Sequence, residues 1–171
     1  MLEGMTRADQ ALGQLTDALQ ASDEPTVVVF FGDHRPNLFM TDGETVYTKL
    51  GLSPSSDTTE WTAEEIGDLY STDYLIWANP AAEQLLGREI EGQGPTISPC
   101  YLMNVVFEQL GWEGTAFSKL NDQYRQTLSV MSTTGHYVIN GQYTSQIPAE
   151  VEELVEEFTA VHDFRKYNFQ P

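Results

Sequence analysis

Basic side chains are scarce in this chain of 171 residues, which has 8 lysines and arginines against 26 aspartates and glutamates. The formal net charge is −18. A chain so acidic repels phosphates, which argues against nucleic acid as a partner and against unassisted docking on an anionic membrane. The same charge favours a soluble surface and is compatible with cation binding, although a solvated acidic face requires no ligand.

Cysteine and long hydrophobic runs are also nearly absent. Cys100 is the only cysteine, so an internal disulfide is excluded, and a lone cysteine in an apolar stretch is typical of a small core residue. The sequence contains no signal peptide and no apolar run of about 18 residues that could span a bilayer. We therefore expect a soluble chain of one domain, large enough to bury a sizeable core.

One short apolar run, residues 26–31, has no charge and stops at Gly32. Such a run predicts a strand buried on both faces, as in a parallel sheet, and ligands bind outside the carboxyl ends of such strands. Asp33 and His34 follow at that end. Because Gly32 permits a turn and Pro36 prevents the strand from resuming, the two side chains can converge in one cleft. A carboxylate beside an imidazole suits a divalent metal such as Mn or Zn, while the alternative is an ordinary turn residue beside a surface histidine.

The other candidate residues carry weaker signals. Arg35 could hold a phosphate or sulfate bidentately, or could be an ordinary surface arginine. His136 and His162 are more typical of packed or half-exposed histidines than of ligands. The sequence has neither a glycine-rich phosphate loop nor a Gly-x-Ser-x-Gly nucleophile motif.

Periodicity and turn signals place the remaining elements. The predicted helices cover residues 5–21, 63–70, 81–86, 99–110, 117–128 and 148–167. Thr6 and Asp9, and likewise Thr62 and Glu65, stand at capping-box spacing at the start of the first two. Ser98 as N-cap, Pro99 at the first helical position and Gly111 as the stop are predicted to bound the fourth. A second strand is predicted over residues 74–78, and Asn140-Gly141 predicts a type I′ hairpin over residues 136–144. The polar stretch from Pro36 to about Glu60 is interpreted either as a wall of the suspected site or as disordered chain.

Gly32-Asp33-His34, together with the strand before it, resembles the metal-binding segment of the alkaline phosphatase/sulfatase superfamily. More narrowly it resembles the phosphoglycerol transferases of the lipoteichoic acid synthase type. The likeness extends to residues 72–79, 98–111 and 164–169, so it spans nearly the whole chain. It covers only the carboxyl-terminal part of that family's catalytic domain.

The resemblance implies a fold. Residues 1–171 would be the carboxyl-terminal portion of an α/β domain of the alkaline phosphatase/sulfatase type. Its central, mostly parallel sheet would be flanked by helices, those over residues 5–21 and 99–110 among them, with the β-hairpin appended near the carboxyl terminus.

The resemblance also implies a chemistry. Asp33 and His34 match two ligands of one divalent metal ion, with Mn favoured and Mg or Zn as alternatives, and Arg35 would contact substrate. The family's threonine nucleophile falls in a segment upstream of Met1, so this chain alone is expected to be inactive. Within this chain no residue is expected to be catalytic.

The expected function is a fragment of a phosphoglycerol transferase that acts on a phospholipid head group in cell-envelope polymer synthesis, at the extracellular face of the bacterial cell membrane. Its partners would be that head group, or another phosphate or sulfate ester, and the upstream part of the same polypeptide. The alternatives are a sulfatase or phosphatase-type hydrolase of the same superfamily and a non-catalytic binding remnant. The oligomeric state is left open.

Overall fold

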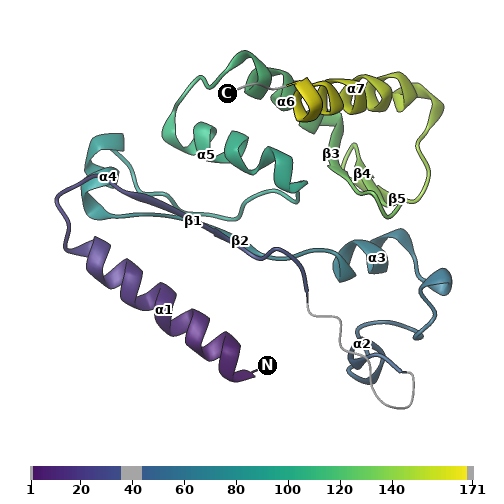
Figure 1. The fold of residues 1–171 in the computed structure, drawn as a ribbon, viewed down its shortest axis with the longest axis horizontal. Coiled ribbons are helices and arrows are strands. Elements are labelled where there is room, and N and C mark those ends of the chain that lie inside the picture. The colour runs from purple at the N-terminus through teal and green to yellow at the C-terminus, as the bar shows by residue number, and fades with distance from the viewer. Residues whose placement is uncertain (1, 36–43, 169–171) are drawn as a thin grey trace. The chain divides into compact units, whose positions relative to one another are not determined.

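The computed structural model describes residues 2–35 and 44–168 and has a mixed α/β composition (Figure 1). The chain divides into two compact units. The first comprises Met1–Gly32 and Asp73–Gly94, and the second comprises Asp33–Thr72 and Pro95–Pro171. Among the described helices none is long and apolar enough to cross a membrane.

The first unit is built on two paired strands, β1 (Val27–Phe31) and β2 (Tyr74–Ala78). The prediction that these two runs are neighbours is confirmed, with Val27 opposite Ala78 and Phe31 opposite Tyr74. The pairing is antiparallel, so the expected mostly parallel sheet is wrong for the strands that the structure describes. An apolar run indicates that a strand is partly buried but carries no information about its direction relative to a partner.

Burial of this pair is also less complete than predicted. Val28 and Ile76 are half-buried, whereas Phe30, Phe31 and Leu75 are exposed. The prediction of strands buried on both faces is therefore not met within this unit.

Asn79 joins the helices of the first unit to its strands. It is fully buried at the start of α4 (Pro80–Leu86), where its Oδ1 accepts hydrogen bonds from the backbone N–H groups of Ala82 and Thr26, both at 2.9 Å. Its Nδ2 donates to the carbonyls of Leu19, Ser22 and Glu24 at 2.9–3.2 Å. The last turn of α1 (Leu2–Gln20) is thereby tied to the end of β2.

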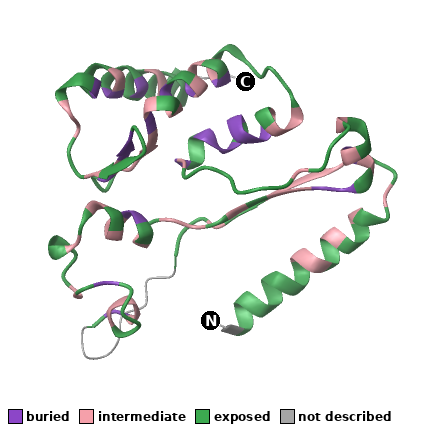
Figure 2. Cartoon of the chain, turned by 180° about the vertical axis from the view of Figure 1, so that it is seen from behind, coloured by how far each residue is buried: buried purple, intermediate pink, exposed green. Residues whose placement is uncertain are grey.

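Helix α1 starts earlier and packs less than the sequence suggests. It begins at Leu2, so Thr6 lies inside the helix and the capping box predicted there is wrong. Ala8, Ala11 and Leu15, which belong to its apolar stripe, are exposed, and Figure 2 shows the helix mostly in exposed and intermediate colours. This helix was expected to pack on the sheet, but in the structure it buries little of its apolar stripe.

The second unit contains most of the helices and one sheet. Its helices are α2 (Val46–Lys49), η1 (Thr58–Glu60), α3 (Ala63–Leu69), η2 (Pro99–Tyr101), α5 (Leu102–Leu110), α6 (Ala116–Thr127), η3 (Ala149–Val151) and α7 (Glu152–Asn168). Its core consists of Tyr101, Tyr124, Leu128, Ile139, Val151, Val155 and Phe158. Cys100 is exposed beside this core, so its predicted role as a small core residue is wrong.

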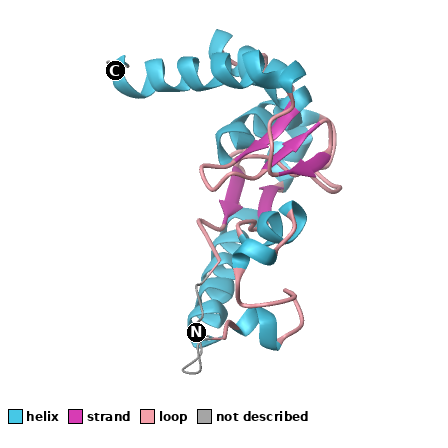
Figure 3. Cartoon of the chain, turned by 90° about the vertical axis from the view of Figure 1, so that its right-hand side faces the viewer, coloured by secondary structure: helices cyan, strands magenta, loops and turns pink. Residues whose placement is uncertain are grey.

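The sheet of the second unit has the strand order β3 (Leu128–Met131), β4 (Tyr137–Ile139), β5 (Gln142–Thr144), all antiparallel (Figure 3). The predicted hairpin is confirmed, because Asn140 and Gly141 have φ angles of 49° and 76° as a type I′ turn requires. Strand β3 is not predicted from the sequence.

Ser98 connects β3 to the start of the predicted helix over residues 99–110. Instead of capping that helix, its hydroxyl bonds the backbone of Met131, accepting from N–H at 2.9 Å and donating to the carbonyl at 3.2 Å. Pro99 begins the 3₁₀ turn η2 and Gly111 ends α5 with φ 65°, as expected.

Helix α3 is the element that joins the candidate site to the hairpin. Its predicted capping box is confirmed: the Thr62 hydroxyl accepts from Glu65 N–H at 3.2 Å, and the Glu65 carboxylate accepts from Thr62 N–H at 2.8 Å. Gly67 packs so closely on Tyr143 of β5 that a Cβ at this position would lie 2.6 Å from the tyrosine ring. Directly after the helix, Tyr70 stacks on His136 with 5.6 Å between ring centroids.

Candidate functional site

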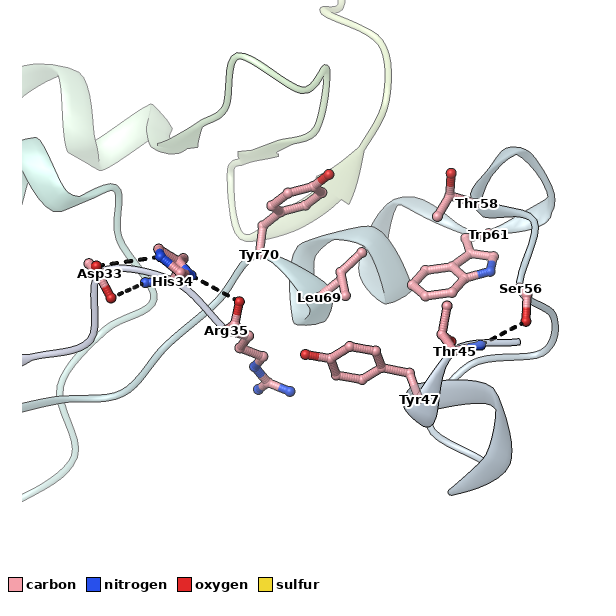
Figure 4. Close-up of a pocket in the computed structure, with 10 residues that line it drawn as sticks. All are labelled: Asp33, His34, Arg35, Thr45, Tyr47, Ser56, Thr58, Trp61, Leu69 and Tyr70. Atoms are coloured by element: carbon pink, nitrogen blue, oxygen red, sulfur yellow. Dashed lines mark hydrogen bonds and ion pairs between the residues drawn. The ribbon is translucent and has the colours of Figure 1, made fainter. Parts of the chain in front are cut away.

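Asp33 and His34 lie directly after Gly32, the residue that follows β1, and line a cleft of about 410 Å³ in the second unit (Figure 4). The lining residues are Asp33, His34, Arg35, Thr45, Tyr47, Ser56, Thr58, Trp61, Leu69 and Tyr70. The prediction that the polar stretch after Pro36 walls the site is confirmed for Thr45, Tyr47, Ser56 and Thr58, while residues 36–43 lie outside the described residues.

The backbone orients the Asp33 and His34 side chains toward each other. Asp33 Oδ1 accepts the His34 backbone N–H at 2.9 Å. His34 Nδ1 lies 3.0 Å from the Arg35 carbonyl and must donate there, because a carbonyl oxygen can only accept. His34 Nε2 then faces Asp33 Oδ2 at 3.5 Å, and both side chains are exposed to solvent, by 76% and 86% respectively.

A divalent ion requires ligand atoms with lone pairs that face a common point. In the neutral ring with Nδ1 protonated, Nε2 carries a lone pair, so two acceptors face each other across 3.5 Å. Asp33 and His34 would hold a divalent ion through these two atoms. If the ring is protonated instead, the same two atoms form an exposed ion pair.

The fit extends to two donors only. Within residues 2–35 and 44–168 the structure has no group of three or more His, Cys, Asp or Glu side chains placed to hold a metal ion. Since a metal site needs four or more ligands, these two residues supply part of a coordination shell. Their role as metal ligands stays a prediction.

Arg35 lies in the same cleft but is held in a different direction. Its Nε donates to the Ser71 carbonyl at 2.7 Å, which fixes the side chain against the segment after α3. Figure 4 shows its guanidinium on the side of Tyr47 and not beside Asp33 and His34. The predicted substrate contact of Arg35 is untested by this arrangement.

Sequence reasoning missed the aromatic residues Tyr47, Trp61 and Tyr70, which line the cleft beyond Arg35. A signal for them was present, because Tyr47 lies in the polar stretch that follows the candidate site, Trp61 lies at its end and Tyr70 ends the helix predicted next. The Trp61 indole Nε1 donates to the Ser55 carbonyl at 2.8 Å, which fixes its ring.

A cluster of hydroxyl groups supports this part of the cleft. The Thr48 hydroxyl lies 3.0–3.2 Å from those of Thr45, Ser53 and Ser56, and the Thr45 backbone N–H donates to the Ser56 hydroxyl at 3.2 Å. Thr45 and Ser53 are buried. Satisfied buried polar groups of this kind rigidify the backbone that carries them.

The other two histidines lie outside the cleft lining. His136 is buried between the hairpin and Tyr70, its Nδ1 lies 2.9 Å from the Thr134 hydroxyl, and burial lowers its pKa. His162 on α7 stacks on Phe158 with 4.0 Å between ring centroids, and its Nε2 lies 3.1 Å from Asn121 Oδ1. Both are packed as the sequence suggests, so they stabilise the fold and are not part of the candidate site.

Comparison with known proteins gives a family. A family model described as Sulfatase matches residues 1–112, a span that contains Asp33, His34 and the whole cleft lining. A Rhizobium meliloti (strain 1021) protein named for a proposed role in cyclic beta-1,2-glucan modification is 29% identical over 134 residues. That alignment covers 72% of this chain but only 18% of the relative, so the chain spans less than a fifth of the relative's length. No solved structure matches. Because the family model covers more than half of the residues, this chain belongs to the sulfatase family.

Proposed function

We propose that this chain is part of a metal-dependent phosphoglycerol transferase of the sulfatase family that modifies a glucan of the bacterial cell envelope. The observation that carries the proposal is the convergence of Asp33 Oδ2 and His34 Nε2, 3.5 Å apart at the mouth of a cleft. Support also comes from the relative's name, which refers to modification of cyclic beta-1,2-glucan. The donor would be a phospholipid head group.

The residues of this chain have distinct tasks in the proposal. Asp33 and His34 would hold one divalent ion, with Mn favoured, and the Arg35 carbonyl keeps His34 in the tautomer whose Nε2 can ligate. A bound ion neutralises charge that develops on phosphoryl oxygens. Arg35, from the same cleft, would contact a phosphate oxygen of the substrate.

The nucleophile is proposed to come from another part of a longer protein. The family resemblance calls for a threonine, preceding the residues described here, that attacks phosphorus and displaces the lipid alcohol. The glucan hydroxyl then displaces the threonine and receives the phosphoglycerol group. The complete enzyme would act at the extracellular face of the bacterial membrane. Nucleic acid is not a proposed partner, because the formal charge of −18 repels it.

A sulfate-ester hydrolase is the second candidate function. It is favoured by the family model itself, which is named for sulfatases. The same pair of donors and the same arginine would serve a sulfate ester as well as a phosphate ester, since both present charged oxygens.

Transfer of labelled glycerol phosphate from phosphatidylglycerol to a β-1,2-glucan tests the proposal. The 171-residue chain and a version extended on its amino-terminal side would each be assayed with Mn and with a chelator. We expect activity only in the extended protein with Mn. His34→Ala in that protein should lower activity by more than about 100-fold, because losing a ligand costs more than losing the group that orients it.

Glu64→Gln is the matched control for Asp33→Asn. Both substitutions remove one exposed carboxylate charge, but Glu64 lies on α3 and is not among the cleft residues. Asp33→Asn should abolish transfer and Glu64→Gln should leave it unchanged. Robust transfer by the 171-residue chain alone would contradict the proposal that the nucleophile comes from another part of a longer protein. Hydrolysis of a sulfate ester without transfer would establish the second candidate instead.

A further inference from the structure

The cleft has two chemically different parts. One part contains the charged side chains Asp33 and Arg35 together with His34. The other part is uncharged and combines aromatic, aliphatic and hydroxyl side chains: Thr45, Tyr47, Ser56, Thr58, Trp61, Leu69 and Tyr70. Figure 4 shows the uncharged side chains extending away from Asp33 and His34, with the Trp61 and Tyr47 rings next to Thr45. We call these seven residues the aromatic part of the cleft.

We propose that the aromatic part of the cleft binds a neutral saccharide unit of the substrate. The inference rests on the proposed function, because it names the chemical class that occupies the other part of the same cleft. A pyranose ring has an apolar C–H face and a rim of hydroxyl groups. The C–H face of the sugar packs against the electron-rich faces of aromatic rings, and its hydroxyl rim forms hydrogen bonds with side-chain hydroxyls.

The volume of the cleft and the fixed positions of its rings agree with such a ligand. A volume of about 410 Å³ lies within the range of small-molecule sites. The Trp61 ring is anchored through the Ser55 carbonyl, and Tyr70 is anchored by stacking on His136. Rings that are already held lose little conformational freedom when a ligand binds, which favours affinity.

The chemistry of the aromatic part argues against two other occupants, an anionic head group and an acyl chain. It contains no lysine or arginine, and the chain carries a formal charge of −18, so it does not attract an anionic head group. Its hydroxyl groups, on Thr45, Ser56 and Thr58, make the lining partly polar, and an acyl chain offers such a lining no hydrogen bonds. A neutral polyhydroxyl ligand can pack on the rings and still form hydrogen bonds with the polar part of the lining.

Binding of a β-1,2-linked glucose trisaccharide to the 171-residue chain tests the inference. Two-dimensional NMR of the unchanged protein follows the indole N–H of Trp61, with that of Trp112 as the internal reference. Trp112 lies just after α5, is 63% exposed and does not line the cleft. We expect saturable shifts for Trp61 and none for Trp112.

Variants measure how much each ring contributes. Trp61→Ala should weaken the trisaccharide's affinity by about tenfold, equivalent to ~1.4 kcal/mol, while the matched Trp112→Ala should leave it unchanged. Because Trp61→Ala could disturb the local fold, Tyr47→Ala is compared in the same way with Tyr167→Ala, which removes an exposed tyrosine outside the cleft. Circular dichroism confirms that each variant is folded.

The outcomes separate this inference from the proposed function. Absence of saturable shifts at Trp61, or equal losses in Trp61→Ala and Trp112→Ala, would overturn the inference. Shifts at Trp61 with glycerol phosphate but not with the trisaccharide would also overturn it, by assigning the aromatic part to the donor. The titration needs neither metal nor turnover. Binding of the trisaccharide by the 171-residue chain, together with failure of the extended protein to transfer phosphoglycerol with Mn, would therefore contradict only the proposed function.

Discussion

The imidazole of His34 is held from one side by the backbone. Its Nδ1 donates to the Arg35 carbonyl, which leaves Nε2 as the atom that faces Asp33. Histidines that bind metals are commonly oriented in this way through their second nitrogen. The local turn after β1 therefore presents both side chains to one point, and the adjoining Arg35 is tied to a distant segment by its hydrogen bond to the Ser71 carbonyl.

His162 is a histidine whose surroundings disfavour its charged form. Burial lowers its pKa, and the nearby Arg165 lowers it further, although Asp163 acts in the opposite direction. The ring also stacks on Phe158. The neutral form is therefore the one that fits the fold.

We expect this histidine to make stability depend on pH. Because its pKa is lower in the folded than in the unfolded chain, its contribution is complete above the ordinary histidine pKa of 6.5 and is lost as the pH falls below it. The free energy of unfolding by urea should thus decrease between pH 7.5 and pH 5.5, and less so in His162→Gln.

His136 provides the comparison for that experiment. Burial lowers its pKa as well, so part of the pH dependence should persist in His162→Gln and should disappear only when His136→Gln is added. If the free energy of unfolding of the double variant changed with pH as steeply as that of the unchanged protein, other groups would be the cause of the pH dependence.

At the scale of elements, the hairpin of β4 and β5 organises the second unit. Val138 and Ile139 contribute buried side chains from β4, and Tyr143 on β5 receives the surface of α3 at Gly67. Because α3 carries Leu69 and ends next to Tyr70, the position of the hairpin decides where one wall of the cleft lies.

Gly141→Ala should destabilise this hairpin. The residue has φ 76°, a left-handed conformation that costs an alanine about 1–2 kcal/mol. We expect the free energy of unfolding, measured with urea, to fall by about that amount.

Gly13→Ala is the matched control, since this glycine lies inside α1 with open space around its Cα and without positive φ. The same substitution should there raise stability by up to about 1 kcal/mol, because alanine is the better helix former. Destabilisation of equal size in both variants would indicate a general effect of the substitution and not a requirement of the turn.

At the scale of the whole molecule, we expect the proposed metal site to need more donors than this chain supplies. The chain spans 18% of the length of its Rhizobium meliloti relative, and the residues that the structure describes supply two donors. A coordination shell assembled from several segments depends on all of them being present. We therefore expect tight metal binding to be a property of the assembled protein and not of the Asp33–His34 pair alone.

We expect the 171-residue chain to bind Mn only weakly, with a dissociation constant nearer to millimolar than to micromolar. Isothermal calorimetry measures it. Asp33→Ala should abolish the remaining binding, whereas Glu64→Gln should not, which separates the site from attraction by the general negative charge. Micromolar or tighter binding that Asp33→Ala abolishes would show that the shell is more complete than two donors.

Local signals in the sequence predicted much of the secondary structure. The capping box of Thr62 and Glu65, the Asn140-Gly141 turn and the glycine stop after α5 are decided by neighbouring residues, and each is confirmed. β3 was missed, because its four residues follow α6 directly and continue the apolar spacing of that helix. Ser98 was misassigned because its partner, Met131, is 33 residues away.

The sequence by itself therefore determined which segments form helices and turns, and that a carboxylate and an imidazole stand together after an apolar strand. Those features depend on contacts between residues a few positions apart. Only the tertiary structure decided that β1 and β2 run antiparallel, that Asn79 joins α1 to β2, and that Tyr47, Trp61 and Tyr70 line the cleft with Asp33 and His34. Strand direction and the composition of a cleft depend on which distant segments pack together, and no local pattern of residue types encodes that choice.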